Sequence, residues 1–282
     1  ILNIILDPIF IFDLESLGGF GFGLGIAGAA MATVISQVVV FIVFIFMLFF
    51  KNHSYISFNL SDFTFSTDII WEIIKVGLPA SLSMIVMAVG QGVFNKILVH
   101  ISVNTVAAYQ VAGRLDMLVF LPIFSIAASL TTLVGMFYGA KEYGALRYII
   151  KYGIFSALLI TIISSIIVYI FAGNVVRFFT DDASIVIIAV NFLQIFAFAY
   201  PFISVGITTG RVLQGLGKGL PVLIITIVRV LGVSAPLALF FVFIMDKTVE
   251  WVWYSMMLST IVAFGIGLTW LISTLKTLPA SR

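Results

Sequence analysis

The sequence predicts an all-α membrane protein, a polytopic bundle of helices, and three observations lead to this fold class. Apolar residues make up 62% of the 282-residue chain and charged residues only 9%, with a mean hydropathy of +1.25. Soluble domains are about half apolar and a quarter charged. Apolar runs long enough to cross a bilayer as helices recur along the chain. Continuous runs such as residues 38–50 have no alternating polar face, which excludes the strands of a transmembrane barrel.

Each apolar run predicts one helix, in chain order 1–12, 25–50, 77–100, 105–138, 149–172, 185–210, 220–244 and 251–275. The first run is too short to cross a bilayer. It also begins without Met inside a hydrophobic stretch, so we expect that an N-terminal portion precedes it.

The distribution of basic residues predicts which connections are cytoplasmic. If the connections alternate sides, one side collects most of the loop cations, namely Lys51, Lys75, Lys141, Arg147, Lys151, Arg211, Lys218, Lys276 and Arg282. The other side collects acids, namely Asp13, Glu15, Asp181, Asp182, Asp246 and Glu250. Cytoplasmic loops carry an excess of Lys and Arg. We therefore expect a multi-pass protein of the cell membrane with loops 51–76, 139–148 and 211–219 and the C-terminus in the cytoplasm.

An internal similarity predicts the domain organisation. The helix pair at 1–50 and the pair at 220–275 each have a Pro-containing helix, a loop with acidic residues and a second helix bearing hydroxyl side chains. Repeated hydropathy units are typical of transporters, and here they indicate a unit of six helices. Residues 1–50 are then the last two helices of a first lobe. A cytoplasmic linker, 51–76, follows, with DIIWEIIKVG as a short amphipathic helix on the membrane surface. Residues 77–282 form a complete second six-helix lobe.

An acidic residue near the start of the chain is the strongest candidate for a functional site. Asp7 lies in ILNIILDPIFIF, and a carboxylate in such a segment is costly in lipid. Asn3 lies four residues earlier, on the same helical face. The two oxygen-bearing side chains could hold a proton or a small cation, and Pro8 frees a nearby backbone carbonyl. The alternative is a carboxylate that only marks the end of a helix.

Further polar residues fall inside the predicted helices. Arg229, surrounded by apolar residues, needs a partner within the bundle. Lys96 is expected close to the outer end of its helix, and Arg114 with Asp116 in the outer part of a helix long enough to project beyond the bilayer; all three are expected in structural roles. The uncharged residues Gln91, Asn95, Asn191, Gln194 and Tyr200 either line a cavity or hydrogen-bond a neighbouring helix.

Proline and glycine predict bends and close helix contacts. Pro122, Pro201 and Pro236, like Pro8, mark helix bends. Small residues at four-residue spacing predict close approach of two backbones, at Gly21, Gly25, Ala29 and Thr33 and again at Gly135 and Gly139.

Several function classes are excluded. The chain has no Cys and only two His, so thiolate chemistry is absent, and a net charge of +2 gives no reason to expect nucleic acid. The glycine pattern at residues 23–28 follows no strand, which argues against dinucleotide binding. No catalytic motif or nucleotide-binding loop is present, so we expect no enzyme and no cofactor. Energy must come from an ion gradient or from a partner.

Several longer segments resemble one family of transporters. The run LNIILDPIFIF followed by GLGIAGAAMATVISQ resembles the fifth and sixth helices of multidrug and toxic compound extrusion (MATE) transporters. Further matches are KVGLPASLSM, AAYQVAGRLDMLVFLPIFSIAASLTTLVGMFYGAKEYGALRYIIKYG and RVLQGLGKGLPVLIITIVR. The LNxxLDP pattern is most similar to the bacterial and archaeal branch related to DNA-damage-inducible members.

The resemblance implies a twelve-helix, V-shaped monomeric exporter of two six-helix lobes. It implies antiport of H⁺ or Na⁺ against amphipathic, often cationic, organic compounds by alternating access, with no cofactor beyond the coupling ion. The family's coupling positions match Asn3, Asp7 and Thr33, together with an aspartate on a first helix outside this chain. Another branch of the family carries a carboxylate in its second lobe. The corresponding helices here have Gln91, Asn95 and Asn191 but no acid, so coupling is expected to rest on Asp7.

Three alternatives remain at this point. A lipid-linked oligosaccharide flippase of the same superfamily needs a basic cavity, for which Arg229 is the candidate. An intramembrane enzyme needs two catalytic groups at matched depth, which the sequence does not offer. A receptor or scaffold leaves Asp7 and the repeat without a role.

Overall fold

The computed structural model describes residues 1–13, 21–50 and 65–279, and the chain divides into two units, Ile1–Phe65 and Ser66–Arg282. Within the described residues, seven helices are long and apolar enough to cross a membrane. These helices confirm the predicted all-α, multi-pass membrane fold.

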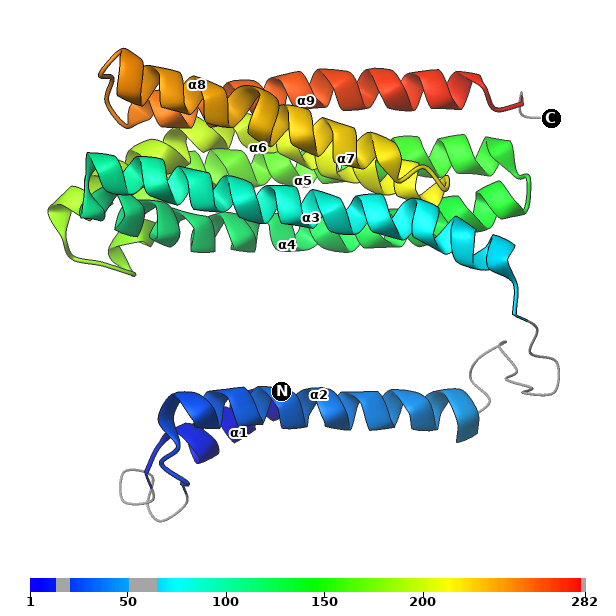
Figure 1. Cartoon of the computed structure of the whole chain (residues 1–282), viewed down its shortest axis with the longest axis horizontal. Coiled ribbons are helices and arrows are strands. Elements are labelled where there is room, and N and C mark those ends of the chain that lie inside the picture. The colour runs from blue at the N-terminus through cyan, green and yellow to red at the C-terminus, as the bar shows by residue number, and fades with distance from the viewer. Residues whose placement is uncertain (14–20, 51–64, 280–282) are drawn as a thin grey trace. The chain divides into compact units, whose positions relative to one another are not determined.

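The first unit is a pair of packed helices, α1 (Leu2–Ile11) and α2 (Gly25–Phe50) (Figure 1). After α1 the chain returns beside its own end: the N–H of Phe22 donates to the carbonyl of Ile9 at 2.8 Å, and that of Leu24 donates to Phe10 at 2.9 Å. The rings of Phe10 and Phe22 stack, with centroids 5.1 Å apart. These contacts give the last carbonyls of α1 the donors that a helix end lacks, and they hold α1 against α2.

Glycine permits the close approach of α1 and α2, at a position the four-residue spacing did not single out. A Cβ on Gly28 would lie 2.2 Å from the Phe10 carbonyl oxygen. Gly25 and Gly139 have open space, so the expectation that they pack helices is wrong; Gly25 instead adopts φ +54°, a conformation that glycine tolerates best. Gly135 does face a neighbouring backbone, with its Cβ position 3.6 Å from the Gly215 carbonyl oxygen.

Replacing Gly28 with valine is expected to push α1 away from α2. The added side chain meets backbone, which cannot rotate aside, and overpacking of this kind costs about 1–3 kcal/mol. Because the chain has no natural Cys, cysteines at Asn3 and Thr33 can be joined by a short thiol cross-linker. Cross-linking should fall sharply with Gly28→Val and persist with Ala27→Val, on the exposed face of the same helix. Equal cross-linking in the two variants would contradict the close contact.

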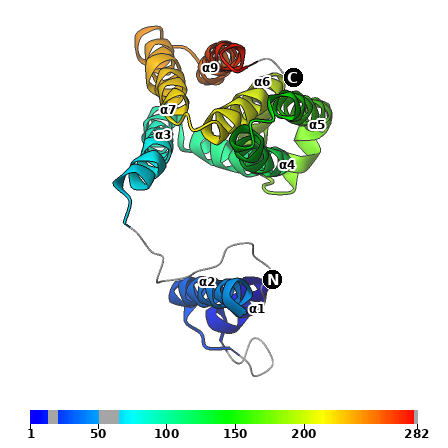
Figure 2. The ribbon, with the colours of Figure 1, turned by 90° about the vertical axis from the view of Figure 1, so that its right-hand side faces the viewer.

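The second unit contains the remaining long helices. Helix α4 (Val103–Gly139), α5 (Tyr143–Arg177) and α6 (Ala183–Gly215) pack on one another, and α9 (Glu250–Lys276) packs on α6. Helix α3 (Thr67–Ile101) lies beside α7 (Leu220–Ile227), as Figures 1 and 2 show.

Helix α3 begins earlier than predicted. Residues 68–77, expected as a separate surface helix, form the first turns of α3. Ser66 starts the helix, since its hydroxyl accepts from the N–H of Ile69 at 3.5 Å and occupies the usual capping position. Residues 51–64 of the predicted linker lie outside the described residues.

The span from Leu220 to Ile244 alternates between α-helical and π-helical winding. After α7 come a π-helical turn η2 (Val228–Ser234), a short α8 (Ala235–Leu239) and a second π-helical turn η3 (Phe240–Ile244). Pro236 lies between the two wide turns. A proline lacks the N–H for the ordinary helical bond, and π-turns are common at functional sites. Pro8, Pro122 and Pro201 lie inside α1, α4 and α6; the bends expected there stay a prediction.

Two clusters of buried side chains form the core of the second unit. The larger joins α3, α4, α5, α6, α8, η3 and α9 around Trp253, Tyr200 and Phe192. The smaller lies toward the carboxyl ends of α4 and α6, around Val134, Leu146 and Leu213. Elsewhere, large apolar side chains are exposed along the helices, as a lipid-facing surface requires.

Asp182 is expected to stabilise the start of α6 in a pH-dependent way. Its Oδ1 accepts from the Ser184 hydroxyl at 2.7 Å, the Ser184 N–H at 2.8 Å and the Ile185 N–H at 3.4 Å. The Ser184 hydroxyl, helped by these backbone N–H groups, lowers the pKa of Asp182. Because the folded pKa lies below the unfolded one, the stabilisation is present above the usual Asp range and is lost as pH falls through the folded pKa.

Asp182→Ala should therefore lower the Tm of the solubilised protein modestly at neutral pH. The difference from wild type should shrink as the pH is lowered through the Asp range, because a protonated carboxyl caps less well. Asp182→Asn, which keeps a capping oxygen, should lose less. A Tm difference that stays constant with pH would rule out a charged cap.

Candidate functional site

The structure brings together the three side chains on which the sequence placed the coupling ion. The Asn3 Nδ2 group donates to Asp7 Oδ1 at 3.1 Å and also to Thr33 Oγ1 at 3.4 Å. Thr33 in turn donates to the Ala29 carbonyl at 3.0 Å. The amide of Asn3 thus bridges a carboxylate on its own helix and a hydroxyl on α2. Residues 30 apart in sequence form one polar cluster on an otherwise apolar helix pair.

The local fold positions each member of this cluster. Asn3 and Asp7 are one turn apart on α1, so they share a face. Pro8 removes the N–H that would bond the Ile4 carbonyl, which leaves a free acceptor next to the carboxylate. Ser36 lies one turn beyond Thr33 on α2, and its hydroxyl is buried with no hydrogen-bond partner among the described residues. Sequence inspection missed Ser36, although its spacing from Thr33 could have indicated it.

This cluster can bind a proton or a small hard cation. Asp7 provides the negative charge, and the oxygens of Asn3, Thr33 and Ser36 are the neutral ligand type that such cations prefer. Binding of either species neutralises a carboxylate that is half-buried in an apolar pair of helices. A neutral site needs less water than a charged one.

The uncharged polar residues of the second unit fall into different environments. Asn95 accepts a hydrogen bond from the Gln110 side chain at 3.3 Å, so it links α3 to α4. Gln91 is exposed on α3. Asn191 and Gln194 instead line a cavity of about 490 Å³ between α5, α6 and α9.

Aromatic side chains form much of that cavity's wall, including Tyr169, Phe198 and Tyr254. The Asn191 Oδ1 atom is buried and has no hydrogen-bond partner among the described residues. Apolar walls with a few polar groups are the usual form of small-molecule pockets. For Asn191 and Gln194 the structure therefore agrees with a cavity-lining position, whereas Asn95 serves helix packing.

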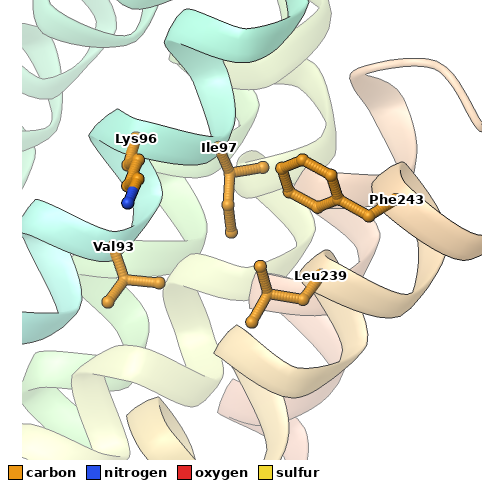
Figure 3. A pocket seen from close by; sticks show the side chains of 5 residues that line it. All are labelled: Val93, Lys96, Ile97, Leu239 and Phe243. Atoms are coloured by element: carbon orange, nitrogen blue, oxygen red, sulfur yellow. The ribbon is translucent and has the colours of Figure 1, made fainter.

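A second cavity of about 430 Å³ lies between α3 and the segment α8–η3. Val93, Lys96 and Ile97 line it from α3, and Leu239 and Phe243 from the opposite side (Figure 3). Lys96 is exposed; that its amine reaches polar surroundings stays a prediction.

Tyr200 is fully buried and its hydroxyl donates to Asp116 Oδ1 of α4. The sequence interpretation placed Asp116 in the outer part of a long helix, in a structural role; the structure adds its partner on α6, Tyr200. Arg229, on η2, interacts electrostatically with Tyr109. Sequence reasoning could not pair Asp116 with Tyr200, because 84 residues separate them.

No group of three or more His, Cys, Asp or Glu side chains that could hold a metal ion occurs within residues 1–13, 21–50 and 65–279.

Comparison with known proteins identifies the family. The MatE family pattern matches residues 79–240, more than half of the chain. The chain belongs to the MatE family. The matched residues run from α3 to η3, all within the second unit of this MatE chain.

Relatives of the MatE chain match most of its length. It is 29% identical over 238 residues to a probable multidrug resistance protein NorM of Thermotoga maritima, covering 84% of this chain and 50% of that protein. It is 32% identical over 218 residues to the multidrug export protein MepA of Staphylococcus aureus, covering 77% of this chain and 46% of that protein. The chain therefore spans about half the length of the curated relatives it matches.

The fold agrees with a solved MATE structure. An outward-facing multidrug resistance MATE family transporter of the MOP superfamily matches with a TM-score of 0.88 and 32% identity, over 99% of this chain and 61% of that one. Neither NorM nor MepA is named as a flippase, so these relatives do not favour the oligosaccharide-flippase alternative.

Proposed function

We propose that this MatE protein is a cation-coupled antiporter that exports amphipathic, often cationic, organic compounds. The observation that carries the proposal is the hydrogen-bonded cluster of Asn3, Asp7 and Thr33 on two apolar helices. The similarity to NorM and MepA, which are named for multidrug resistance and export, supports the class of substrate.

The mechanism we propose is alternating access. In one state the Asp7 carboxylate is charged and requires water or a ligand; binding of H⁺ or Na⁺ neutralises it. The Asn3 amide then no longer faces a full negative charge, and its two hydrogen bonds can rearrange. Since the bond from Asn3 to Thr33 joins α1 to α2, ion binding at Asp7 changes the contact between the helices, beside the weakened backbone at Pro8. Ion and substrate thereby favour different conformations.

The membrane orientation belongs to the same proposal. With the helix ends and connections at 139–148 and 211–219 in the cytoplasm, Lys141, Arg147 and Arg211 follow the usual bias of cytoplasmic segments; Arg147 lies in the first turns of α5 and Arg211 in the last turns of α6. The acidic residues near Asp182 and Glu250 then lie on the opposite side. Labelling of single cysteines in these loops in intact cells tests this arrangement.

The function is tested with the natural full-length protein in proteoliposomes. Efflux of a cationic dye is measured under an imposed proton gradient, under an imposed sodium gradient, and with neither. We expect gradient-driven efflux in one of the first two conditions, and which one identifies the coupling ion. Dye movement that is the same in all three conditions would exclude ion-coupled export.

A further inference from the structure

The second unit contains a carboxyl group that the proposed coupling site does not use. Asp116 is partly buried on α4, and the hydroxyl of Tyr200, which is 0% exposed, donates to its Oδ1 atom. The neighbours Ala112 and Leu115 are buried apolar residues. The ring of Phe120 packs edge-on against Tyr200, with centroids 5.4 Å apart. The carboxyl therefore lies at the edge of the aromatic core.

The charged and titratable groups around Asp116 come from three elements. Tyr200 of α6 provides the hydrogen bond, and Tyr109 lies two turns earlier on α4, within electrostatic range of Asp116. Arg229 of η2 interacts with Tyr109. Arg114, two residues before Asp116, is exposed. Within the described parts of α3 and α5, which also pack on α4, no titratable side chain interacts with Asp116.

These surroundings do not neutralise a negative charge. One neutral hydroxyl donor compensates only part of the hydration that a carboxylate loses in an apolar interface. Tyr109 interacts electrostatically with both Asp116 and Arg229, and its ring also stacks on Trp253 at 5.8 Å and meets Phe192 edge-on at 5.6 Å. Among the described residues no cation is bonded to Asp116, and because an unpaired buried charge is costly, a ligand that removes the charge stabilises this acid.

Polar groups next to Tyr200 are available to such a ligand. Ser204 lies one turn after Tyr200 on the same face of α6, and its hydroxyl is fully buried with no hydrogen-bond partner among the described residues. Pro201 lacks an N–H, so the Ala197 carbonyl has no helical donor. This part of α6 thus has two acceptors not used by the helix itself.

We propose that Asp116 is a second proton-binding site, located in the second unit and distinct from Asp7. The ligand we propose is a proton and not a metal cation, because among the described residues the only side chain bonded to the carboxyl is the Tyr200 hydroxyl, whereas a metal ion needs several oxygen ligands. The proton comes from water that reaches the exposed edge of Asp116 and returns to it. With the proton bound, the contact between α4 and α6 is neutral; without it, the charge favours entry of water between them.

The test is infrared difference spectroscopy of the purified natural protein during a pH titration. Protonated carboxyl groups have a C=O band that carboxylates lack. We expect Asp116→Asn to remove such a band, and Tyr200→Phe to move it to higher frequency because the hydrogen bond to the carbonyl is lost. Asp182→Asn is the matched control: its carboxyl lies outside the membrane-spanning helices, and it should leave the band unchanged. The comparison is repeated in an Asp7→Asn background, which removes the acid of the first unit.

The site is overturned if the band is the same in wild type and Asp116→Asn, because Asp116 is then ionised. If Asp116→Asn does not fold, the Tyr200→Phe spectrum decides: an unshifted band overturns the proposal. The measurement uses no gradient and no substrate. Its outcome is therefore separate from that of the efflux experiment, and either proposal can fail alone.

Discussion

Replacing Asp7 with asparagine is expected to reduce gradient-driven efflux to the leak seen in protein-free vesicles. Asparagine keeps the size and can still hydrogen-bond Asn3, which is 3.1 Å away in the wild type, but it cannot change charge. The ion then has no charge to neutralise, and a ligand can shift a conformational equilibrium only through its different affinity for the two states. Efflux of a cationic dye from proteoliposomes, under the gradient that drives the wild type, measures the effect.

Thr33 provides the matched comparison for this experiment. Thr33→Ser keeps the hydroxyl that accepts from Asn3 at 3.4 Å and should retain efflux, whereas Thr33→Val removes it and should weaken ion binding. Dye binding to the Asp7→Asn protein, measured without a gradient, separates lost coupling from misfolding. Undiminished gradient-driven efflux by Asp7→Asn would end the coupling proposal.

The largest expected loss of stability comes from Trp253→Ala. Trp253 is 0% exposed, and its ring stacks on Tyr109 at 5.8 Å and meets Phe192 edge-on at 4.9 Å. Truncation leaves a cavity between α4, α6 and α9 that close-packed neighbours fill only in part. Phe or Trp to Ala changes in protein cores cost about 3–5 kcal/mol. Thermal unfolding of the detergent-solubilised protein should show a lower Tm.

Two variants control for side effects of this substitution. Trp251→Ala removes the same side chain from a position that is 39% exposed, so it should cost less. Trp253→Phe should also cost less than Trp253→Ala, because the ring is kept and the indole N–H it removes has no hydrogen-bond partner among the described residues. Equal Tm losses for Trp251→Ala and Trp253→Ala would show that Trp253 is not central to the core.

Much of the candidate coupling site was predictable because its information is local. Asn3 and Asp7 are four residues apart, and helical periodicity alone places them on one face. Thr33 could be added only from the family resemblance, since no periodicity relates residues on different helices. Ser36 was missed for a different reason: it lies one turn after Thr33 on the same helix, but its relevance depends on burial, which spacing does not show.

The features that the sequence analysis got wrong or did not find have a common physical cause: they depend on how whole helices run and pack. Gly25 and Gly28 are equally small in the sequence, but the crossing point of α1 and α2 places only Gly28 against a backbone oxygen. Residues 68–77 contain a polar face typical of a surface helix, yet the helix continues through Pro79 as the single helix α3. No partner was predicted for Asp116, whereas the packing of α4 on α6 brings Tyr200 to it.

The sequence by itself determined that this chain forms apolar helices, roughly where each begins and ends, and that an acid sits in the first of them, because hydropathy and helical period depend on neighbours along the chain. Only the tertiary structure decided which helices touch, which glycines they need, and which polar side chains meet. Those contacts join residues tens of positions apart, and their geometry depends on how whole helices pack, not on local preference.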